Sequence, residues 1–343
     1  MHRKITLEDV AKEAGVSLGA ASKALNGYSS ISEPTRRRVL NASQRLGYER
    51  RPWGRKWTVA QSQAHVGLAL LGDNPHVPYM KHWTDSFTQA AVDNRFRLEM
   101  LHIPDQESPQ WQEEFVRLTR GLAGVLVFDY LRKQLVPFIV NLPVPAVVVG
   151  NVQPSTQPSL NQVSVDTQGM GAFATRTLLE AGHRRIGFCS NTGVPGGWFY
   201  HWRAGYQLTM LESGHGLDQR LCPILTNRPT HELAIEMADL SLRLAEPPTA
   251  FIAPNAQLAW SLRHVMAERG VHLGPERMII GADPGELGKH GMESYPSLSD
   301  NHDEGATQAM RLLAHLKRRH RSTTSVRVTV PFHSHNWEVF RKP

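Results

Sequence analysis

Cysteine is scarce in this chain of 343 residues, and long apolar runs are missing altogether. With only Cys189 and Cys222 present, a disulfide scaffold and a cysteine-rich zinc site are both excluded. No uncharged apolar run reaches the ~18 residues that a membrane-spanning helix needs. The opening residues Met1–Asp9 lack the apolar stretch of a secretory signal. These absences predict a cytoplasmic protein in a reducing compartment, with no membrane partner.

The usual catalytic and metal-binding signatures are missing as well. The sequence has no Gly-Lys-Ser/Thr phosphate loop, no Gly-x-Ser-x-Gly elbow and no His-Glu-x-x-His motif. The 17 histidines do not replace them, because no carboxylate or cysteine joins a pair such as His333 and His335 at ligand spacing. We therefore expect no enzyme activity, no metal and no cofactor.

The formal net charge of +7 is concentrated at one end of the chain. Residues 1–58 contain 12 of the 38 Lys and Arg residues but only 5 of the 31 Asp and Glu residues, whereas the other 285 residues contain 26 of each. Lys and Arg close to DNA phosphates release condensed counterions, which drives binding. A basic segment on a neutral body therefore predicts a head that binds nucleic acid, with a basic solvated tail as the alternative.

Capping residues and apolar spacing predict three short helices in this head. Thr6 and Asp9 match a capping box, apolar residues at helical spacing follow, and Gly15 ends the first helix. A second helix is predicted over residues 17–25, and a third begins after the N-cap Ser32. Two short helices joined by a turn and closed by a third form a helix-turn-helix domain. The residues expected inside it are Leu7, Val10, Ala11, Ala14, Ala21, Ala24, Leu25, Val39, Leu40, Leu46 and Tyr48.

Four strings of residues make the head more specific than its periodicity alone. They are TLEDVAKEAGVS from Thr6, SKALNG from Ser22, TRRRV from Thr35 and LGY from Leu46. Together they resemble the DNA-binding head of the lactose-repressor (LacI/GalR) family. The resemblance implies a recognition helix in the major groove that reads base edges with Leu18, Gly19 and Lys23, of which only Lys23 is a strong donor to guanine. The implied phosphate contacts are Thr6, Ser17, Ser22, Asn26 and Tyr48; for Ser17, a purely structural role as N-cap is an equal alternative.

Residues 49–60 occupy the place of the family's hinge, which becomes helical on operator DNA and enters the minor groove. This chain departs from the family pattern, because Gly54 replaces a helix-favouring alanine and Trp57 stands where a leucine wedge is expected. Glycine disfavours helix by about 1 kcal/mol relative to alanine. We expect the basic residues to drive minor-groove contact, with Trp57 either stacking on a base or packing on the body. The hinge residues are Arg50, Arg51, Gly54, Arg55, Lys56 and Trp57.

Strands alternate with helices in the remainder of the chain, which is typical of an α/β fold with parallel sheets. Apolar runs predict strands at 65–71, 97–102, 124–128, 146–149, 185–189, 249–253, 278–281 and 325–332. Helices are predicted at 80–94, 109–120, 131–141, 166–181, 202–213, 231–244, 255–269 and 304–317. Two such series of elements predict two lobes with a cleft between them.

The body carries further landmarks of the family, including LLEAGHRRIGF from Leu178 and RAGY from Arg203. The expected fold is therefore an all-α helix-turn-helix head plus an α/β body, in which two periplasmic-binding-protein-like lobes with parallel sheets are linked by three crossovers. The expected domains are a head at 1–48, a hinge at 49–60 and a body at 61–343. Lobe 1 is expected at about 61–163 and 294–325, and lobe 2 at about 164–293 and 326–343.

Ligands bind at the carboxyl ends of parallel strands and between domains, so we expect a small-molecule effector in the cleft. Its expected contacts are Asp73, Asn74, Tyr79, Asp129, Asn151, Asn191, Trp198, Trp202, Asn255 and Asp283. Two departures weaken a sugar as this ligand. Trp202 stands where the family has its effector arginine, with Arg203 one place along, and Ala256 replaces an aspartate. The aromatic segment at Trp198 either stacks on a ligand or packs under a loop, and Asp166 is expected to be a helix cap.

These features predict a transcription regulator, in particular a repressor. It is expected to bind a pseudo-palindromic operator in double-stranded DNA as a homodimer, gated by a sugar or sugar-derived effector. A dimer is expected because no heptad helix follows the last predicted strand. Two alternatives stay open: an operator binder whose cleft has lost its ligand, and a sugar-binding or sugar-converting protein whose basic head is incidental.

Overall fold

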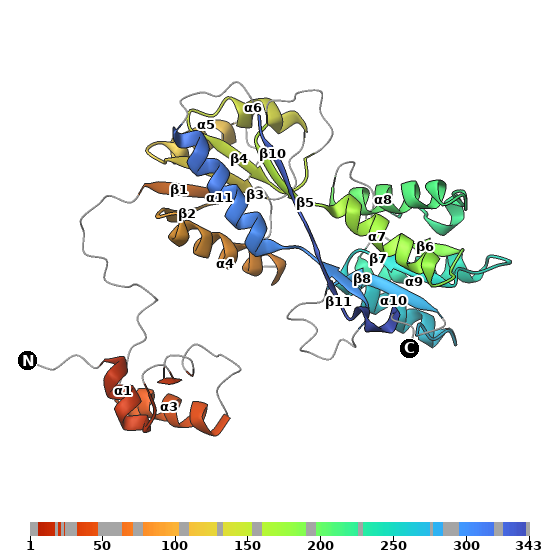
Figure 1. The fold of residues 1–343 in the computed structure, drawn as a ribbon, viewed down its shortest axis with the longest axis horizontal. Helices are drawn as coiled ribbons and strands as arrows, with labels where there is room; N and C mark the ends of the chain where they lie inside the picture. The colour runs from red at the N-terminus through yellow and green to blue at the C-terminus, as the bar shows by residue number, and fades with distance from the viewer. Residues whose placement is uncertain are drawn as a thin grey trace, which may run out of the picture. The chain divides into compact units, whose positions relative to one another are not determined.

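The structure is a computed structural model in which the chain separates into two compact units, residues 1–62 and residues 63–343. We call the first unit the head and the second the body (Figure 1). The described residues are 6–17, 20–21, 24, 33–46, 64–70, 78–102, 110–128, 133–152, 160–189, 197–225, 229–274, 277–283, 295–318 and 325–340. Within these ranges, no helix has the length and apolarity needed to cross a bilayer.

The head begins with α1, Leu7–Ala14, whose two ends are fixed as the sequence predicts. At its start, the amide of Asp9 donates to Thr6 Oγ1 at 3.3 Å while the amide of Thr6 donates to Asp9 Oδ2 at 2.8 Å. This reciprocal capping box satisfies two backbone donors that have no partner within the helix. At its end, Gly15 has φ = 65°, a left-handed conformation that glycine adopts without a Cβ penalty.

A small apolar core joins α1 to α3, Glu33–Arg45. Residues 20, 21 and 24, from the predicted second helix, are helical and lie in the same fold unit. The buried side chains are Val10, Ala11, Ala14, Ala21, Ala24, Val39 and Ala42. Leu40 was predicted to be inside but is 48% exposed, because the small residues at positions 39 and 42 occupy the inner face of α3. In the described part of the head, three segments thus contribute a core of alanine and valine.

The body contains two sheets, each with helices on both faces (Figure 1). The first sheet has the order β10-β5-β4-β3-β1-β2, and all its pairings are parallel. Its strands are β1 His65–Leu70, β2 Arg97–His102, β3 Gly124–Phe128, β4 Ala146–Val149, β5 Gln162–Val165 and β10 Arg327–Val330. The helices grouped with it are α4 Pro78–Asp93, α5 Trp111–Thr119, η1 Lys133–Leu135, α6 Val136–Val140 and α11 His302–Arg318.

The second sheet has the order β11-β9-β8-β7-β6, and only the β11–β9 pair is antiparallel. Its strands are β6 Ile186–Phe188, β7 Ala250–Ala253, β8 Met278–Ala282, β9 Ser297–Ser299 and β11 His333–His335. The remaining helices are α7 Thr167–Glu180, α8 Trp198–Glu212, η2 Gln219–Leu221, α9 Thr230–Leu242, α10 Ala256–Glu268 and η4 Trp337–Phe340. The predicted α/β body with parallel sheets is confirmed.

The two faces of the first sheet are covered by different helices. On one face, Leu68, Leu126 and Val147 pack in a core with residues of α4 and α11 such as Phe87 and Met310. On the other face, the core holds Ala69, Val125, Val127 and Val148 from β1, β3 and β4, together with residues of α5 and α6. Because both faces of β1, β3 and β4 are covered, these strands are apolar runs rather than alternating ones. We call the second face the α5/α6 face.

The assignment of segments to lobes corrects the boundaries predicted from sequence. Strand β10 pairs with β5 in the first sheet, although residues 326–343 were expected in lobe 2. Conversely, β9 pairs with β8 in the second sheet, although residues 294–325 were expected in lobe 1. The chain passes between the sheets from β5 to α7, from β9 to α11 and from β10 to β11. Local periodicity identifies strands but not their partners, which explains these two errors.

Candidate nucleic-acid interface and effector cavity

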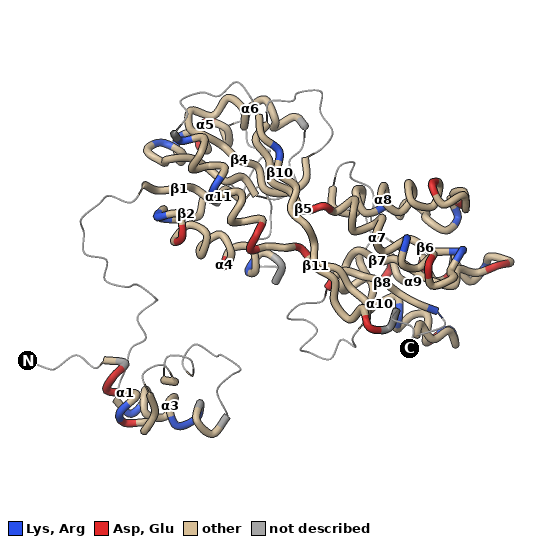
Figure 2. The backbone as a smooth tube through the Cα atoms, viewed as in Figure 1, with Lys and Arg blue, Asp and Glu red and all other residues tan. Residues whose placement is uncertain are grey.

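The described part of the head presents basic side chains beside a small folded core. Arg37 and Arg38 lie exposed on α3, and Lys12 lies exposed in the last turn of α1. Figure 2 shows basic positions on both helices. Arg45 of α3 forms an exposed ion pair with Glu13 of α1 at 3.3 Å, a type of contact that contributes little to stability in water. Exposed guanidinium groups on a folded scaffold are suited to phosphate contact.

Two of the predicted DNA contacts lie in the described residues, and both cap helices. Thr6 Oγ1 accepts from the amide of Asp9, and Ser17 Oγ accepts from the amide of Ala20 at 3.2 Å. These bonds give Ser17 the N-cap role that the sequence offered as an alternative. The remaining predicted contacts lie outside the described residues: Leu18, Gly19, Ser22, Lys23, Asn26, Tyr48, Arg50, Arg51, Gly54, Arg55, Lys56 and Trp57.

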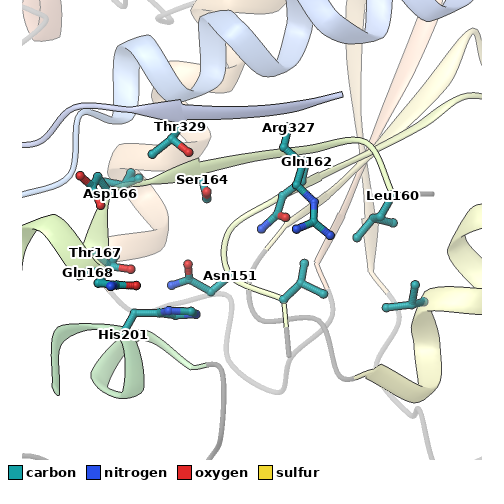
Figure 3. A pocket seen from close by; sticks show the side chains of 13 residues that line it. Asn151, Leu160, Gln162, Ser164, Asp166, Thr167, Gln168, His201, Arg327 and Thr329 are labelled. Atoms are coloured by element: carbon teal, nitrogen blue, oxygen red, sulfur yellow. The ribbon is translucent and has the colours of Figure 1, made fainter. Parts of the chain in front are cut away.

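The body holds a cavity of about 400 Å³ beside β5 and β10, where β5 leads into α7 (Figure 3). This volume lies within the range of about 300–1,000 Å³ that small-molecule sites occupy. Its lining residues are Val136, Asn151, Val152, Leu160, Gln162, Ser164, Val165, Asp166, Thr167, Gln168, His201, Arg327 and Thr329.

Polar residues alternate along both strands that border this cavity. The parallel register pairs Arg327 with Gln162 and Thr329 with Ser164. Side chains two residues apart on a strand share one face, so these four residues lie together on the α5/α6 face of the sheet (Figure 3). The intervening residues, such as Val163 and Val330, point into the opposite core.

Gln162 is held along the cavity by the backbone of the neighbouring strand. Its Nε2 donates to the carbonyl of Gly150 at 2.9 Å, one residue beyond the end of β4. Asn151 follows directly and also lines the cavity. The arrangement places two amide side chains, from Gln162 and Asn151, beside the hydroxyl of Ser164, so the wall offers both donors and acceptors.

The first turns of α7 and α8 supply the other end of the cavity. Asp166 is the N-cap of α7, where its Oδ1 accepts from the amide of Gly169 at 2.8 Å. The carboxylate is therefore stabilised at the positive end of a helix dipole. Gln168 of α7 and His201 of α8 lie beside it (Figure 3). The prediction that Asp166 caps a helix is confirmed, and the same residue also lines the cavity.

Glycine allows α7 and α8 to approach each other closely beside this end. A Cβ placed on Gly171 would collide with the backbone carbonyl of Trp202, and one on Gly205 would collide with the carbonyl of Gln168. Because each glycine faces the backbone of the other helix, no side-chain rearrangement can make room. The crossing fixes Gln168 and His201 relative to one another at the cavity.

Of the predicted effector contacts that the structure describes, Asn151 lines this cavity and four others lie elsewhere. Trp198 Nε1 donates to the carbonyl of Pro254 at 3.1 Å, and Asn255 Oδ1 caps α10 by accepting from the amide of Leu258 at 2.9 Å. Asp283 accepts from Ser297 Oγ at 3.4 Å. The side chain of Tyr79 and the residues Asp73, Asn74, Asp129 and Asn191 lie outside the described part.

Trp202 and Arg203 have structural roles that the sequence did not predict. Trp202 is 0% exposed and packs in the core, so its prediction as a ligand contact is wrong. Arg203 is 9% exposed, and its Nη2 donates to the carbonyl of Cys222 at 2.9 Å. Neither side chain supplies a charged group to the cavity. The aromatic start of α8 is thus mainly packing, which was the alternative to ligand stacking.

Four residues that line the cavity were not predicted from the sequence: Gln162, Ser164, Arg327 and Thr329. The sequence does contain a sign of these residues, because polar residues at alternate positions interrupt two otherwise apolar strands. Only the pairing of β5 with β10 brings the two patterns side by side. The two strands are separated by more than 160 residues, so no local pattern could have joined them.

Comparison with known proteins agrees with this architecture. Residues 6–51 match the family described as bacterial regulatory proteins, lacI family, and residues 175–334 match the periplasmic binding protein-like domain. Catabolite control protein A of Priestia megaterium is 25% identical over 316 residues, covering 90% of this chain and 91% of that protein. The transcriptional repressor CytR of Escherichia coli K12 is 25% identical over 318 residues, covering 90% and 88%.

A solved structure shows that the fold extends over both units. The Lac repressor dimer bound to operator and the anti-inducer ONPF matches with a TM-score of 0.64 at 16% identity, covering 97% of this chain and 98% of that one. A helix-turn-helix head joined to a periplasmic-binding-protein-like body defines a class of bacterial transcriptional regulators. The chain carries a head that matches the lacI family, as its sequence predicted, together with a periplasmic binding protein-like domain. Both of these relatives are regulatory proteins rather than enzymes.

Proposed function

We propose that the chain is a cytoplasmic, homodimeric repressor that binds a pseudo-palindromic operator in double-stranded DNA and is gated by a small molecule bound to the body. The observation that carries the proposal is the concentration of the entire net charge of +7 in residues 1–58, on a head that matches the lacI family. Such a charge distribution binds a polyanion at one end of the chain and leaves the neutral body free for another ligand.

Operator recognition is assigned to the second helical segment of the head. Leu18, Gly19 and Lys23 are proposed to meet base edges in the major groove, with Lys23 as the donor to guanine. The proposed phosphate contacts, which fix register, are Thr6, Ser17, Ser22, Asn26 and Tyr48. The basic residues of the hinge are proposed to enter the minor groove: Arg50, Arg51, Arg55 and Lys56. Gly54 lies between them in the sequence, and Trp57 follows them.

The dimer is supported by the Lac repressor dimer that shares this fold. A two-fold dimer presents two heads to two half-sites, so the operator is expected to be pseudo-palindromic. The body also exposes apolar side chains at one edge of the first sheet, where Val92 of α4 is 55% exposed and Met100 of β2 is 48% exposed. We propose this edge as part of the subunit contact, because exposed apolar residues beside an edge strand favour association.

Gating is assigned to the body. A ligand changes operator affinity only as far as it binds two conformations differently, and such coupling is typically about 1–3 kcal/mol. A ligand that moves the two sheets relative to one another would act through the three passages of the chain between them. The cavity beside β5 lies next to one of these passages, which makes it our candidate for the effector site.

Selection of operator sequences from genomic fragments, followed by fluorescence anisotropy at several salt concentrations, tests the proposal. For a dimer with about 6–10 phosphate contacts, affinity should fall by about 10³–10⁵ between 50 and 200 mM salt. Removing residues 1–62 should abolish binding. Lys23→Ala should relax preference at one base pair of each half-site, whereas Lys317→Ala, on α11 in the body, should leave binding unchanged. Affinity that is insensitive to salt would contradict the proposal.

The role of the hinge needs its own measurement. Permanganate or fluorescent-base probing of the bound operator reports whether the central base step is unstacked. Trp57→Ala should restore stacking at that step if the indole is the wedge. An unchanged central step would remove Trp57 from the minor groove and leave the neighbouring basic residues as the contacts there.

A further inference from the structure

We propose that the cavity beside β5 and β10 binds an anionic polyol, a small molecule with several hydroxyl groups and one carboxylate or phosphate, and that Arg327 holds the anion. This inference rests on the proposed function, because it names the chemical class of the effector. It assigns the charged contact to the last strand of the first sheet, a segment that the sequence analysis did not connect with ligand binding.

Arg327 lies at the edge of the first sheet and at the wall of the cavity. Arg327 begins β10, an edge strand, and its side chain lines the cavity next to Gln162 (Figure 3). The structure gives its guanidinium no ion pair or hydrogen bond among the described residues. A guanidinium that is directed into a cavity and has no carboxylate partner is suited to bidentate binding of a carboxylate or phosphate.

Two hydroxyl groups line the cavity next to Arg327. Ser164 and Thr329 face each other across the β5–β10 register, one alternate position further along the strands. This spacing places them about 6.6 Å along the sheet from Gln162 and Arg327. Their hydroxyls both donate and accept, as ligand hydroxyl groups do. A ligand anchored by its anion at Arg327 therefore meets hydroxyl partners in the next row.

The far end of the cavity, at Asp166, disfavours a second negative charge on the ligand. Asp166 lies one further alternate position along β5, about 13 Å along the strand from Gln162. Figure 2 shows a basic position on β10 and an acidic position where β5 leads into α7. A second anion would be repelled by this carboxylate, whereas a hydroxyl group donates to it. The arrangement favours a ligand whose charge is at one end.

The family position for a charged ligand contact is not available in this chain. Trp202 stands at that position and is fully buried, and Arg203 is occupied by the carbonyl of Cys222. Arg327 is the only Lys or Arg among the described residues that line the cavity. The charged contact has thus moved from α8 to β10, which brings the anion to a different wall of the cavity.

Isothermal titration calorimetry on the full-length chain tests the inference with three matched probes. D-Glucuronate carries a carboxylate, D-glucose 6-phosphate carries a phosphate, and D-glucose carries no charge. We expect at least one of the two anions to bind tenfold or more tightly than glucose. The anion that binds identifies whether the carboxylate or the phosphate is preferred.

Substitutions locate the anion within the cavity. Arg327→Gln should weaken the preferred anion at least tenfold, Arg327→Lys should weaken it less, and Thr329→Val should weaken it by a smaller factor. Arg176→Gln removes an exposed arginine on α7 outside the cavity and should leave affinity unchanged. Circular dichroism of each variant checks that the body is folded.

The outcomes separate this inference from the proposed function. Equal binding of glucose and the anions, unchanged by Arg327→Gln, would overturn the anion assignment. Absence of heat with both anions at 10 mM would overturn it as well. In either case, salt-dependent operator binding by the unliganded wild-type chain would leave the proposed regulator standing. Failure of the wild-type chain to bind any operator would instead contradict the proposed function.

Discussion

Strands β3 and β10 lie in the same sheet but differ in what each of their faces contacts. Every residue of β3 is buried, whereas in β10 only Val330 is buried. The face toward α4 and α11 is apolar in both strands, but the α5/α6 face is apolar only where helices cover it. A strand that is covered on one face is free to carry polar side chains on the other. The open edge of the first sheet is where this chain has a cavity.

The head and the body also differ in the interactions on which they depend. Among its described residues the head has a core of seven small buried side chains, and residues 1–58 carry the net charge, whereas the body has extensive apolar clusters on both of its sheets. Binding of DNA requires exposed basic groups on a small folded support. Binding of a small molecule requires a wall that is rigid on one side and polar on the other, which β5 and β10 provide.

Leu126→Ala in β3, a strand that is covered on both faces, should cause the largest loss in the free energy of unfolding. Leu126 is 0% exposed and belongs to the core that α4 and α11 form with the sheet. Truncation of a fully buried leucine costs about 2–5 kcal/mol, because it removes apolar burial and leaves a cavity. Urea unfolding of the body measures the change. A loss below about 1 kcal/mol would mean that the central strand tolerates truncation as an edge strand does.

Gly205→Ala should be the next most severe change, because it disturbs the support of the cavity. The added Cβ would collide with the carbonyl of Gln168, so α7 and α8 would have to separate. We expect a loss of about 1–3 kcal/mol in the free energy of unfolding, together with weaker anion binding, since His201 and Gln168 would shift.

Gly274→Ala is the matched control for this change. A Cβ at Gly274 meets open space, and its φ is outside the left-handed region. Its stability should therefore stay within about 0.5 kcal/mol of the wild type in the same urea unfolding experiment. Equal stabilities of the two variants would show that the helix crossing is not tightly packed.

Acidification should destabilise the covered side of the first sheet through His302. Burial at the start of α11 lowers the pKa of His302 from 6.5 to about 4, with His82 adding to the effect. The imidazole ring contacts Trp83, with ring centroids 5.1 Å apart. The charged and titratable groups around it are His82 from α4, Asp283 after β8, Asp300 after β9, Asp303 on α11 and His333 from β11.

The sign of this effect follows from the lowered pKa. The unfolded chain takes up a proton near pH 6.5 while folded His302 stays neutral, so stability is lost as the pH falls from about 6.5 toward 4. We expect about 1–2 kcal/mol of additional loss by pH 5. His302→Gln should remove this component of the pH dependence, while His264→Gln, on an exposed part of α10, should keep it. Identical pH profiles for all three proteins would contradict the assignment.

Thr329→Val, in a strand that is open on one face, should have the smallest effect on stability of these substitutions. The side chain of Thr329 lies on the open face of β10, so an apolar replacement of the same shape should change the free energy of unfolding by no more than about 0.5 kcal/mol. Thermal unfolding measures the change in the ligand-free protein. A loss above 1 kcal/mol would give the hydroxyl a structural role and weaken the case for a polar ligand wall.

Much of the body's secondary structure was predictable because the apolar runs are long and the helices are marked at their ends. The strands over 97–102, 124–128 and 146–149 occur where the sequence predicts them, and Asp166 caps α7 as expected. Strand β5 was missed because Gln162 and Ser164 interrupt its apolar pattern. The short strands β9 and β11 have too few residues for a periodic signal.

The candidate site was predictable only in part, for a related reason. Asn151 was expected from the rule that ligands meet the carboxyl ends of strands, and it lines the cavity. Trp202 was expected on the same grounds but is buried, because a residue's place in sequence does not determine which side of its helix meets the core. Arg327 was not predicted, because it lies near the start of the predicted strand 325–332. The sequence does not show which strand pairs with this one.

The sequence by itself determined the basic head, its capped first helix, the alternation of strands and helices and the resemblance of the head to the lacI family. These features depend on local composition and on residues a few positions apart. The tertiary structure alone decided that β10 returns to the first sheet, that Arg327 faces Gln162, and that the glycines of α7 and α8 bring His201 to the cavity. Strand pairing and helix crossing depend on which distant surfaces pack together, and no short stretch of sequence contains that information.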